Sequence, residues 1–323
     1  MPISFPALPH SKASTRRFVS ALLVAALFAL ALPSSADSSQ PAQILDVRDA
    51  RFVTEQELVA RLVHARYRLL GEIHDDPAHH AIRARLLEEI AQAGVHPAVV
   101  MEQFDLDHDD ALRAAQQSGA TAAHVAVAGA LDRKGWQWPL HEPIIAAALA
   151  ANLPLRAGNL PRSALFEPET TLGGNASLHT RFDSARWTPA QARTLRHDIV
   201  VDHCGQLPAN VVPRLVLAQR LRDAGMAQAL VDDATADGAI LIAGNGHVRR
   251  DLGVPVYLDA EGGDAAAIMS VGFVEIEPAK LITSELARKL AKRYAVFDYV
   301  WLTPPVARPD PCEAFRRAPK RLH

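Results

Sequence analysis

The stretch "RYRLLGEIHDDPAHHAIRARLLEEIAQAGVHPAVVMEQF", residues 66–104, decides the fold of this chain. Residues 66–72 and 98–104 are short apolar runs, which are typical of buried strands. The segment between them begins at Pro77 and ends at Gly94, and its apolar residues fall at helical spacing. A strand, a helix and a second strand in this order indicate a parallel βαβ unit.

The same pattern recurs in "GAILIAGNGHVRRDLGVPVYL", residues 238–258. It predicts an apolar strand, a glycine, a histidine, a polar turn and then a short strand in "VPVYL". Two more apolar runs, residues 267–276 and 294–302, predict further strands. We therefore expect an α/β fold with a mostly parallel or mixed central sheet, flanked by helices, and a site at the carboxyl edge of the strands.

The middle of the chain is less regular, with an aromatic loop before a predicted helix over 142–151 and a strand near 153–157. Residues 167–185 have the composition of a surface excursion. Thr188 is a predicted N-cap, because Pro189 follows it at the first helical position. A long helix is predicted for "VVPRLVLAQRLRDAGMAQALVDD", residues 211–233.

The N-terminus carries the features of a secretory signal peptide. Arg16 and Arg17 precede an uncharged apolar run, residues 18–32, and Pro33 and small residues up to Ala36 follow. The alternative is an uncleaved anchor, although 15 apolar residues are short for a membrane span. We expect residues 1–36 to be a signal peptide, 37–303 one α/β domain and 304–323 a mobile tail.

Removal of the first 36 residues leaves 287, with 31 basic and 36 acidic residues, and shifts the formal charge from −2 to −5. A mildly acidic chain without a basic block gives no indication of nucleic-acid binding. Cys204 and Cys312 are the only cysteines. An exported chain meets an oxidising compartment, so the two cysteines can pair, but sequence alone leaves the disulfide and two separate thiols equally open.

Polar residues follow three of the predicted strands. Gly71-Glu72-Ile73-His74 and Gly244-Asn245-Gly246-His247 each place a histidine three residues after a glycine that ends an apolar run, and Glu102 lies in the third. If these strands are parallel, the side chains meet at one edge of the sheet.

Each of these residues also has a structural interpretation. Gly-x-x-His occurs often by chance, Glu102 can serve as a helix cap, and His247 can simply close a turn. His79 and His80 begin a helix, so we expect at least one of them to face water. Two glycine–histidine strand ends in one chain favour the functional interpretation.

The segments "LLGEIHDDPAHH", "VVMEQF", "DHCGQLP", "QRLRDAGMA" and "IAGNGHVRRDLGVPVYL" resemble the ChaN-type haem-binding uptake family of the Tiki superfamily. The resemblance runs from about Leu69 to Leu258. It implies an exported periplasmic protein of a Gram-negative bacterium, acting in haem or iron acquisition, with haems held face to face in a homodimer. The chain lacks the lipoprotein attachment cysteine of some relatives, so membrane association stays open.

Matched position by position, the resemblance implies that a haem cofactor is bound by residues of these motifs. They are Glu72, His74, His203, Arg222 and His247, together with the neighbours Cys204 and Asp223. His203 has an alternative role as a basic residue at a helix C-terminus. The planar fork of Arg222 suits either a haem propionate or a carboxylate of the site.

The alternative function is a metal-dependent hydrolase or protease of the same superfamily. His74, His247 and Glu102 would hold a divalent metal ion, and Glu72 or Glu102 would act as the catalytic base. A third option is a binding module for a small ligand. The chemistry of the residues alone slightly favours the hydrolase, whereas the resemblance favours haem binding. We prefer the haem-binding interpretation. The axial ligand stays open, since residues 37–323 contain thirteen histidines and the four tyrosines Tyr67, Tyr257, Tyr294 and Tyr299. The segment "GWQWPLH" (135–141) can supply an apolar wall.

Overall fold

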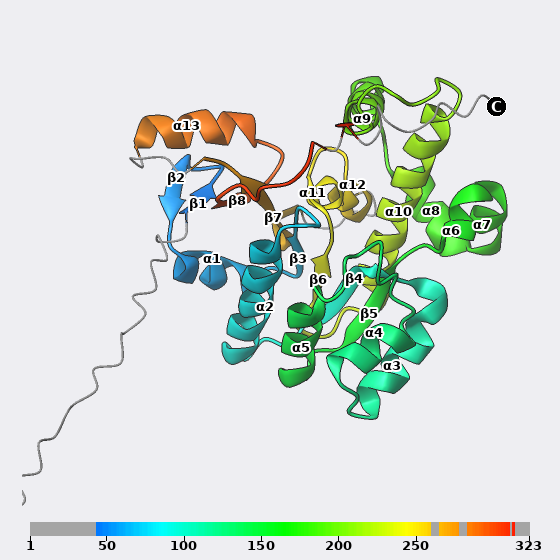
Figure 1. Ribbon diagram of the computed structural model, residues 1–323, viewed down its shortest axis with the longest axis horizontal. Coiled ribbons are helices and arrows are strands. Elements are labelled where there is room, and N and C mark those ends of the chain that lie inside the picture. The colour runs from blue at the N-terminus through cyan, green and yellow to red at the C-terminus, as the bar shows by residue number, and fades with distance from the viewer. Residues whose placement is uncertain (1–42, 260–264, 278–282, 311, 314–323) are drawn as a thin grey trace, which may run out of the picture. The chain divides into compact units, whose positions relative to one another are not determined.

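A computed structural model describes residues 43–259, 265–277, 283–310 and 312–313 of the chain. The predicted signal peptide, residues 1–36, lies outside the described residues. The described residues build one mixed sheet that is covered by helices on both faces (Figure 1). The expectation of an α/β fold is confirmed.

The sheet has eight strands in the order β2-β1-β8-β7-β3-β6-β4-β5. The strands are β1 (Gln43–Asp46), β2 (Arg51–Val53), β3 (Tyr67–Leu70), β4 (Ala98–Asp105), β5 (Leu155–Asn159), β6 (Ala239–Ile242), β7 (Ile268–Glu275) and β8 (Tyr299–Thr303). Each neighbouring pair from β8 to β5 is parallel, whereas β1 pairs antiparallel with both β8 and β2.

Helices connect and cover these strands. They are α1 (Glu55–Leu62), α2 (Pro77–Gln92), α3 (Asp109–Gln117), α4 (Ala122–Ala128), α5 (Glu142–Ala150), α6 (Arg162–Phe166), α7 (Pro168–Gly174), α8 (Ala176–Ser184), α9 (Pro189–Asp202), α10 (Val212–Asp232), α11 (Asn245–Val248), α12 (Val254–Asp259) and α13 (Ser284–Arg293), with short 3-10 turns η1 (Leu106–His108) and η2 (Ala265–Ala267). No helix in the described part of the chain is long and apolar enough to cross a membrane.

The two faces of the sheet are buried by different helices. Leu70 and its neighbours in the adjacent strands pack against α1 to α5, whereas Leu69, one residue earlier, belongs to the opposite core under α10, α12 and α13. This alternation follows from the two-residue period of a strand, and burial on both faces explains the continuous apolar runs of the central strands.

Helix α2 begins and ends where the sequence indicates. The Asp76 carboxylate accepts a hydrogen bond from the Ala78 amide at 2.8 Å, and Pro77 occupies the first turn. Gly94, just beyond the end of the helix, has a positive φ of 83°, which favours glycine. Strand β3 before α2 and strand β4 after it both pair parallel with β6, which lies between them, and this confirms the predicted βαβ unit.

The start of α9 is likewise confirmed. The Thr188 hydroxyl accepts a hydrogen bond from the Gln191 amide, and the Gln191 side chain accepts one from the Thr188 amide, which together form a capping box. The excursion at 167–185 consists of the short helices α7 and α8.

The strand predicted in "VPVYL" is wrong, because these residues form helix α12. The β-branched residues Val254 and Val256 suggest a strand, but Pro255 has no amide proton for a sheet ladder. Val254, Pro255, Tyr257 and Leu258 are buried, and α12 packs against α10. Tertiary packing therefore outweighs the local β-propensity here.

The two cysteines form a disulfide between Cys204, after α9, and Cys312 near the C-terminus. Arg308 donates hydrogen bonds to Asp75 at 2.9 Å and to both oxygens of Glu275 at 2.6 and 2.7 Å. The predicted tail, 304–323, lies only partly within the described residues. In the described part of the tail, the disulfide of Cys204 with Cys312 and the hydrogen bonds of Arg308 hold the chain against the domain.

Candidate functional site

The three strand ends singled out in the sequence lie side by side. Strand β6 pairs parallel with β3 on one side and with β4 on the other. Glu72 and His74 follow β3, Glu102 lies near the end of β4, and His247 lies in α11 after β6. The structure therefore brings all four residues to the carboxyl edge of the sheet, as the sequence pattern indicates.

Glu72 is the centre of the first part of this site, and its side chain has no exposed surface. His74 Nδ1 donates a hydrogen bond to Glu72 Oε1 at 2.5 Å, and Gln103 Nε2 donates to the same oxygen at 3.2 Å. Arg83, from α2, donates to Glu72 Oε2 through Nη2. A buried carboxylate in low dielectric requires such compensation, and Arg83 supplies the opposite charge.

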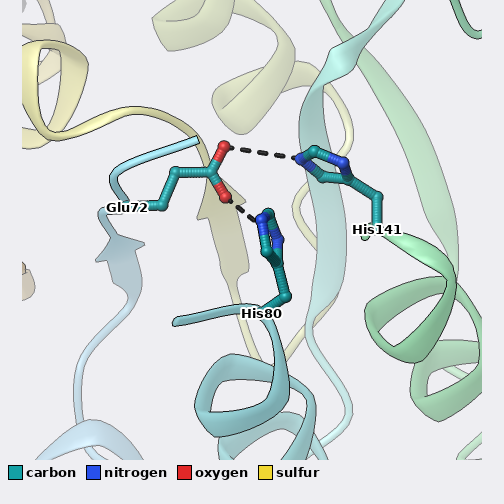
Figure 2. A group of neighbouring side chains, drawn as sticks. All are labelled: Glu72, His80 and His141. Atoms are coloured by element: carbon teal, nitrogen blue, oxygen red, sulfur yellow. Dashed lines mark hydrogen bonds and ion pairs between the residues drawn. The ribbon is translucent and has the colours of Figure 1, made fainter. Parts of the chain in front are cut away.

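Two further histidines face the Glu72 carboxylate (Figure 2). His80, in the first turn of α2, places Nδ1 3.4 Å from Oε2, and His141, at the start of α5, places Nε2 3.5 Å from Oε1. Burial, with the charge of His141 adding to it, lowers the pKa of His80 to about 4. Burial and the charge of Arg83 lower the pKa of His141 to about 3, so both rings are neutral near pH 7.

His247 is the centre of the second part of the site. Its Nδ1 lies 2.6 Å from Asp223 Oδ1 in α10, and its Nε2 lies 3.2 Å from Glu102 Oε1. The other oxygen of Glu102 accepts a hydrogen bond from the Gly244 amide at 2.8 Å. Gln219 Nε2, also from α10, lies 3.2 Å from His247 Nδ1. An imidazole between two carboxylates is held in a fixed orientation, with each ring nitrogen facing an acceptor.

The charges of this second part are strongly coupled. Burial lowers the pKa of His247, but the Glu102 and Asp223 carboxylates outweigh burial and raise it to about 10. Burial raises the pKa of Glu102, but the charge and hydrogen bond of His247, the charge of His74 and the Gly244 amide together outweigh burial and hold this pKa far below its usual range. Burial raises the pKa of Asp223 to about 6 against the opposing charge of His247. His247 is therefore an imidazolium at neutral pH, flanked by two carboxylates.

His74 lies where the two parts meet. A Cβ added at Gly244 would lie 2.9 Å from His74 Cε1 and 3.7 Å from Glu102 Oε2. Burial lowers the pKa of His74, and the charge of Glu102 opposes this effect. Although Glu72 beside it is buried, the His74 side chain is 47% exposed. Trp136, from the aromatic loop, packs edge-on against the His74 ring, with 4.9 Å between the ring centroids. This loop therefore lines the site.

Arg222 lies beside the second part of the site, one residue before Asp223 on α10. Its Nε is buried and has no hydrogen-bond partner among the described residues. Burial is the main cause of the raised pKa of Asp105 and of Asp223, and the positive charge of Arg222 opposes this by lowering both pKa values.

His203 lies at the end of a helix, which is the alternative role that the sequence suggests for it. It is the C-cap residue of α9, and its Nδ1 donates a hydrogen bond to the Ile199 carbonyl at 2.7 Å. Cys204, next to it, is bonded to Cys312. Neither residue is among the side chains described above at the carboxyl edge.

The expectation that His79 or His80 faces water is wrong, because both are buried. His79 Nδ1 accepts a hydrogen bond from the Ile73 amide at 3.0 Å, and its Nε2 lies 2.9 Å from Thr303 Oγ1 and 3.1 Å from Asp76 Oδ2. Consecutive helical residues point in different directions, so His79 packs under β8 while His80 faces Glu72.

Sequence reasoning missed several residues that complete the site, namely Arg83, Gln103, His141 and Gln219. The predicted metal set of His74, Glu102 and His247 is not the group whose donors gather most closely. Among the described residues, Glu72, His80 and His141 bring one donor atom each to within 4.8 Å of one another.

The fold is similar to that of a solved structure describing cofacial haem binding to ChaN of Campylobacter jejuni. The TM-score is 0.62 at 19% identity, over 81% of this chain and 97% of that chain. The type III effector HopBA1 aligns over 77% of this chain and 92% of its own, with a TM-score of 0.40 and 12% identity. A comparison with curated protein sequences found no match. The model of the family "Haem-binding uptake, Tiki superfamily, ChaN" matches residues 58–258, and the chain belongs to this family.

Proposed function

We propose that this protein binds haem at the carboxyl edge of β3, with His74 as the ligand of the haem iron. The observation that carries the proposal is the half-exposed ring of His74, whose Nδ1 is bound to the buried carboxylate of Glu72. Its Nε2 has no hydrogen-bond partner among the described residues, so a lone pair is available there. Histidine is a common axial ligand of haem iron.

The surroundings of His74 suit this role. A carboxylate on the far ring nitrogen fixes the tautomer and orientation of a ligating imidazole and increases its basicity. Burial lowers the pKa of His74, which favours the neutral form that binds metal. Trp136 provides an apolar surface beside the ring. When bound, haem would supply the iron centre, while these residues orient and retain it.

The test is a titration of the purified mature protein with haemin, followed by visible spectroscopy. We expect a saturable Soret shift that His74→Ala abolishes or weakens by at least about tenfold. His179→Ala, at an exposed position in α8, is the matched control and should bind as the parent does. An unchanged spectrum in His74→Ala would exclude His74 as the ligand, and substitution of Tyr294 and Tyr299 would then test the tyrosines.

We further propose that the protein is exported and acts in haem or iron acquisition. The basic, apolar and small-residue segments of residues 1–36 support export. The disulfide between Cys204 and Cys312 also supports it, since disulfides persist in oxidising compartments. N-terminal sequencing of protein from the cell envelope should begin at or near Asp37. Recovery of the intact Met1 form from the cytosol would contradict the proposal.

Haem-linked dimerisation is a separate part of the proposal. It is supported by the likeness to a protein described as binding haem cofacially. Sedimentation with haemin should show a dimer and without haemin a smaller species. Saturation with haemin while the protein stays monomeric would contradict this part and leave haem binding itself intact.

The alternative of a metal-dependent hydrolase is not favoured. Its two candidate bases are both engaged by buried cations, Glu72 by Arg83 and Glu102 by His247. A general base requires a lone pair directed at a water or substrate proton, and these contacts occupy the carboxylate oxygens.

A further inference from the structure

We propose that Glu72, His80 and His141 form a binding site for a divalent transition-metal ion, separate from the haem iron. One donor atom of each lies within 4.8 Å of the other two, and all three side chains are at most 1% exposed. Figure 2 shows both imidazole rings facing the same carboxylate. Both histidines lie outside the two Gly-x-x-His segments, and the site needs no haem, so the inference goes beyond the proposed function.

The hydrogen bonds of His80 direct a lone pair toward Glu72. Its Nε2 lies 2.9 Å from the backbone carbonyl of His74, which can only accept, so Nε2 carries the proton. In the neutral ring Nδ1 is then unprotonated, and it lies 3.4 Å from Glu72 Oε2. An imidazole lone pair and a carboxylate oxygen, both acceptors, therefore face each other in a buried place.

His141 has the same arrangement. Its Nδ1 lies 3.2 Å from the backbone carbonyl of Trp136, so it is the protonated nitrogen. Its Nε2, which carries the lone pair, lies 3.5 Å from Glu72 Oε1. Metal-bound histidines almost always donate the other ring N–H to a carbonyl or carboxylate, as both histidines do here. Each ring thus places its acceptor nitrogen beside one oxygen of the Glu72 carboxylate.

Two histidines and one glutamate are a donor set for zinc and for chemically similar ions such as cobalt. Zinc binds nitrogen and oxygen at about 2.0–2.2 Å, so the ligands of one tetrahedral ion lie roughly 3.3–3.6 Å apart. Donors that lie within 4.8 Å of one another must therefore move together by about 1 Å to share one ion. Gln103 adds a second observation, because its Oε1 is buried and has no hydrogen-bond partner within the described part of the chain. This oxygen can accept a hydrogen bond from a metal-bound water.

Arg83 is the competing cation at this place. Its Nη2 contacts Glu72 Oε2 and lies 2.9 Å from His80 Nδ1, whereas its Nη1 is buried and finds no hydrogen-bond partner in the residues that the structure describes. In the metal-free protein Arg83 therefore compensates the carboxylate and covers one of the lone pairs. A bound dication would take over this compensation, so Arg83 should weaken metal binding rather than support it.

The test uses the mature protein, residues 37–323, free of haem and treated with a chelator, and Co²⁺ alone is the probe. Four-coordinate Co²⁺ has visible absorption bands that loosely bound surface Co²⁺ lacks. We expect the bands to saturate at one equivalent and Zn²⁺ to displace them. His141→Gln, which retains a polar side chain, should weaken binding at least about tenfold. His179→Gln, on the surface, is the control for adventitious histidine binding and should leave it unchanged.

Arg83→Met provides an independent readout with the opposite sign. It removes the competing cation and should tighten Co²⁺ binding, and Co²⁺ should raise its melting temperature more than that of the parent. Binding in the parent that is no tighter than in His141→Gln, or weaker binding in Arg83→Met, would overturn the proposal. A haemin titration of His141→Gln separates the two sites, because haem binding through His74 should persist when Co²⁺ binding is lost.

Discussion

The fully buried side chain of Glu72 accepts a 2.5 Å hydrogen bond from the half-exposed imidazole of His74. The same carboxylate forms an ion pair with Arg83, which is also fully buried. The carboxylate thus connects a solvent-facing ring to a cation in the core. Any change at Glu72 therefore affects both the orientation of His74 and the electrostatic balance of α2.

Replacing Glu72 by Gln should destabilise the protein strongly. Arg83 would keep its charge in a place without exposed surface, and loss of one partner of a buried pair costs about 3–5 kcal/mol. The measurement is the free energy of unfolding in denaturant. Glu55→Gln is the matched control, because it breaks the exposed pair with Arg85 and should cost below about 1 kcal/mol. Equal, small losses in both variants would mean that Arg83 does not depend on Glu72.

The βαβ unit and the strand ends could be predicted because their signals are local. Pro77 and Gly94 mark the ends of α2, and the apolar runs before Glu72 and His247 are long enough to indicate strands. Helix α12 could not be predicted, since only its packing against α10 overrides the β-branched residues. Strands β1 and β2 have the sequences QILD and RFV, so neither lies in a continuous apolar run such as the one that indicates β6.

The site was predictable only as far as its residues follow strands. Glu72, His74, Glu102 and His247 could be grouped because parallel strands end at the same edge. His141 was missed because its place beside Glu72 depends on the packing of α5 against α2, to which no local pattern refers. Similar reasons apply to Arg83 and Gln219, which project from helix faces. The roles of all these residues stay predictions.

Alkaline conditions should reduce stability through His247. Its pKa is about 10 in the folded protein, raised by Glu102 and Asp223 against burial, and about 6.5 in an unfolded chain. Its contribution to stability is therefore complete below about pH 6.5 and is lost as the pH rises toward 10. The free energy of unfolding should fall over this window more steeply in the parent than in His247→Gln. Parallel pH profiles for the two proteins would contradict the charged state assigned to His247.

Loss of the disulfide should destabilise the chain. Cys204 and Cys312 are separated by 108 residues, and a loop of this length corresponds to about 4–5 kcal/mol in the chain-entropy model. Cys204→Ser, Cys312→Ser and the double variant should lose the same amount, since each breaks the same bond. Thermal or denaturant unfolding measures the loss, and a reductant should lower only the parent to the same level. Unchanged stability in the double variant would show that the bond makes no contribution in solution.

A methyl group at Gly244 should impair haem binding without unfolding the protein. The backbone of Gly244, with φ −63° and ψ 155°, is open to alanine, but the new Cβ would lie 2.9 Å from His74 Cε1 and 3.0 Å from its Nε2. The ring must therefore shift, and we expect Gly244→Ala to weaken haemin binding by at least about tenfold, as misplacement of a ligand typically does.

Gly173→Ala is the matched control for this substitution. Its Cβ would meet no atom within 4 Å, and in helix α7 alanine is favoured over glycine by up to about 1 kcal/mol. The control should bind haemin as the parent does and be slightly more stable. The two variants, compared by Soret titration and thermal unfolding, separate a local effect on His74 from a general effect of losing glycine. Full haemin affinity in Gly244→Ala would place the iron ligand elsewhere, since a displaced His74 could not retain it.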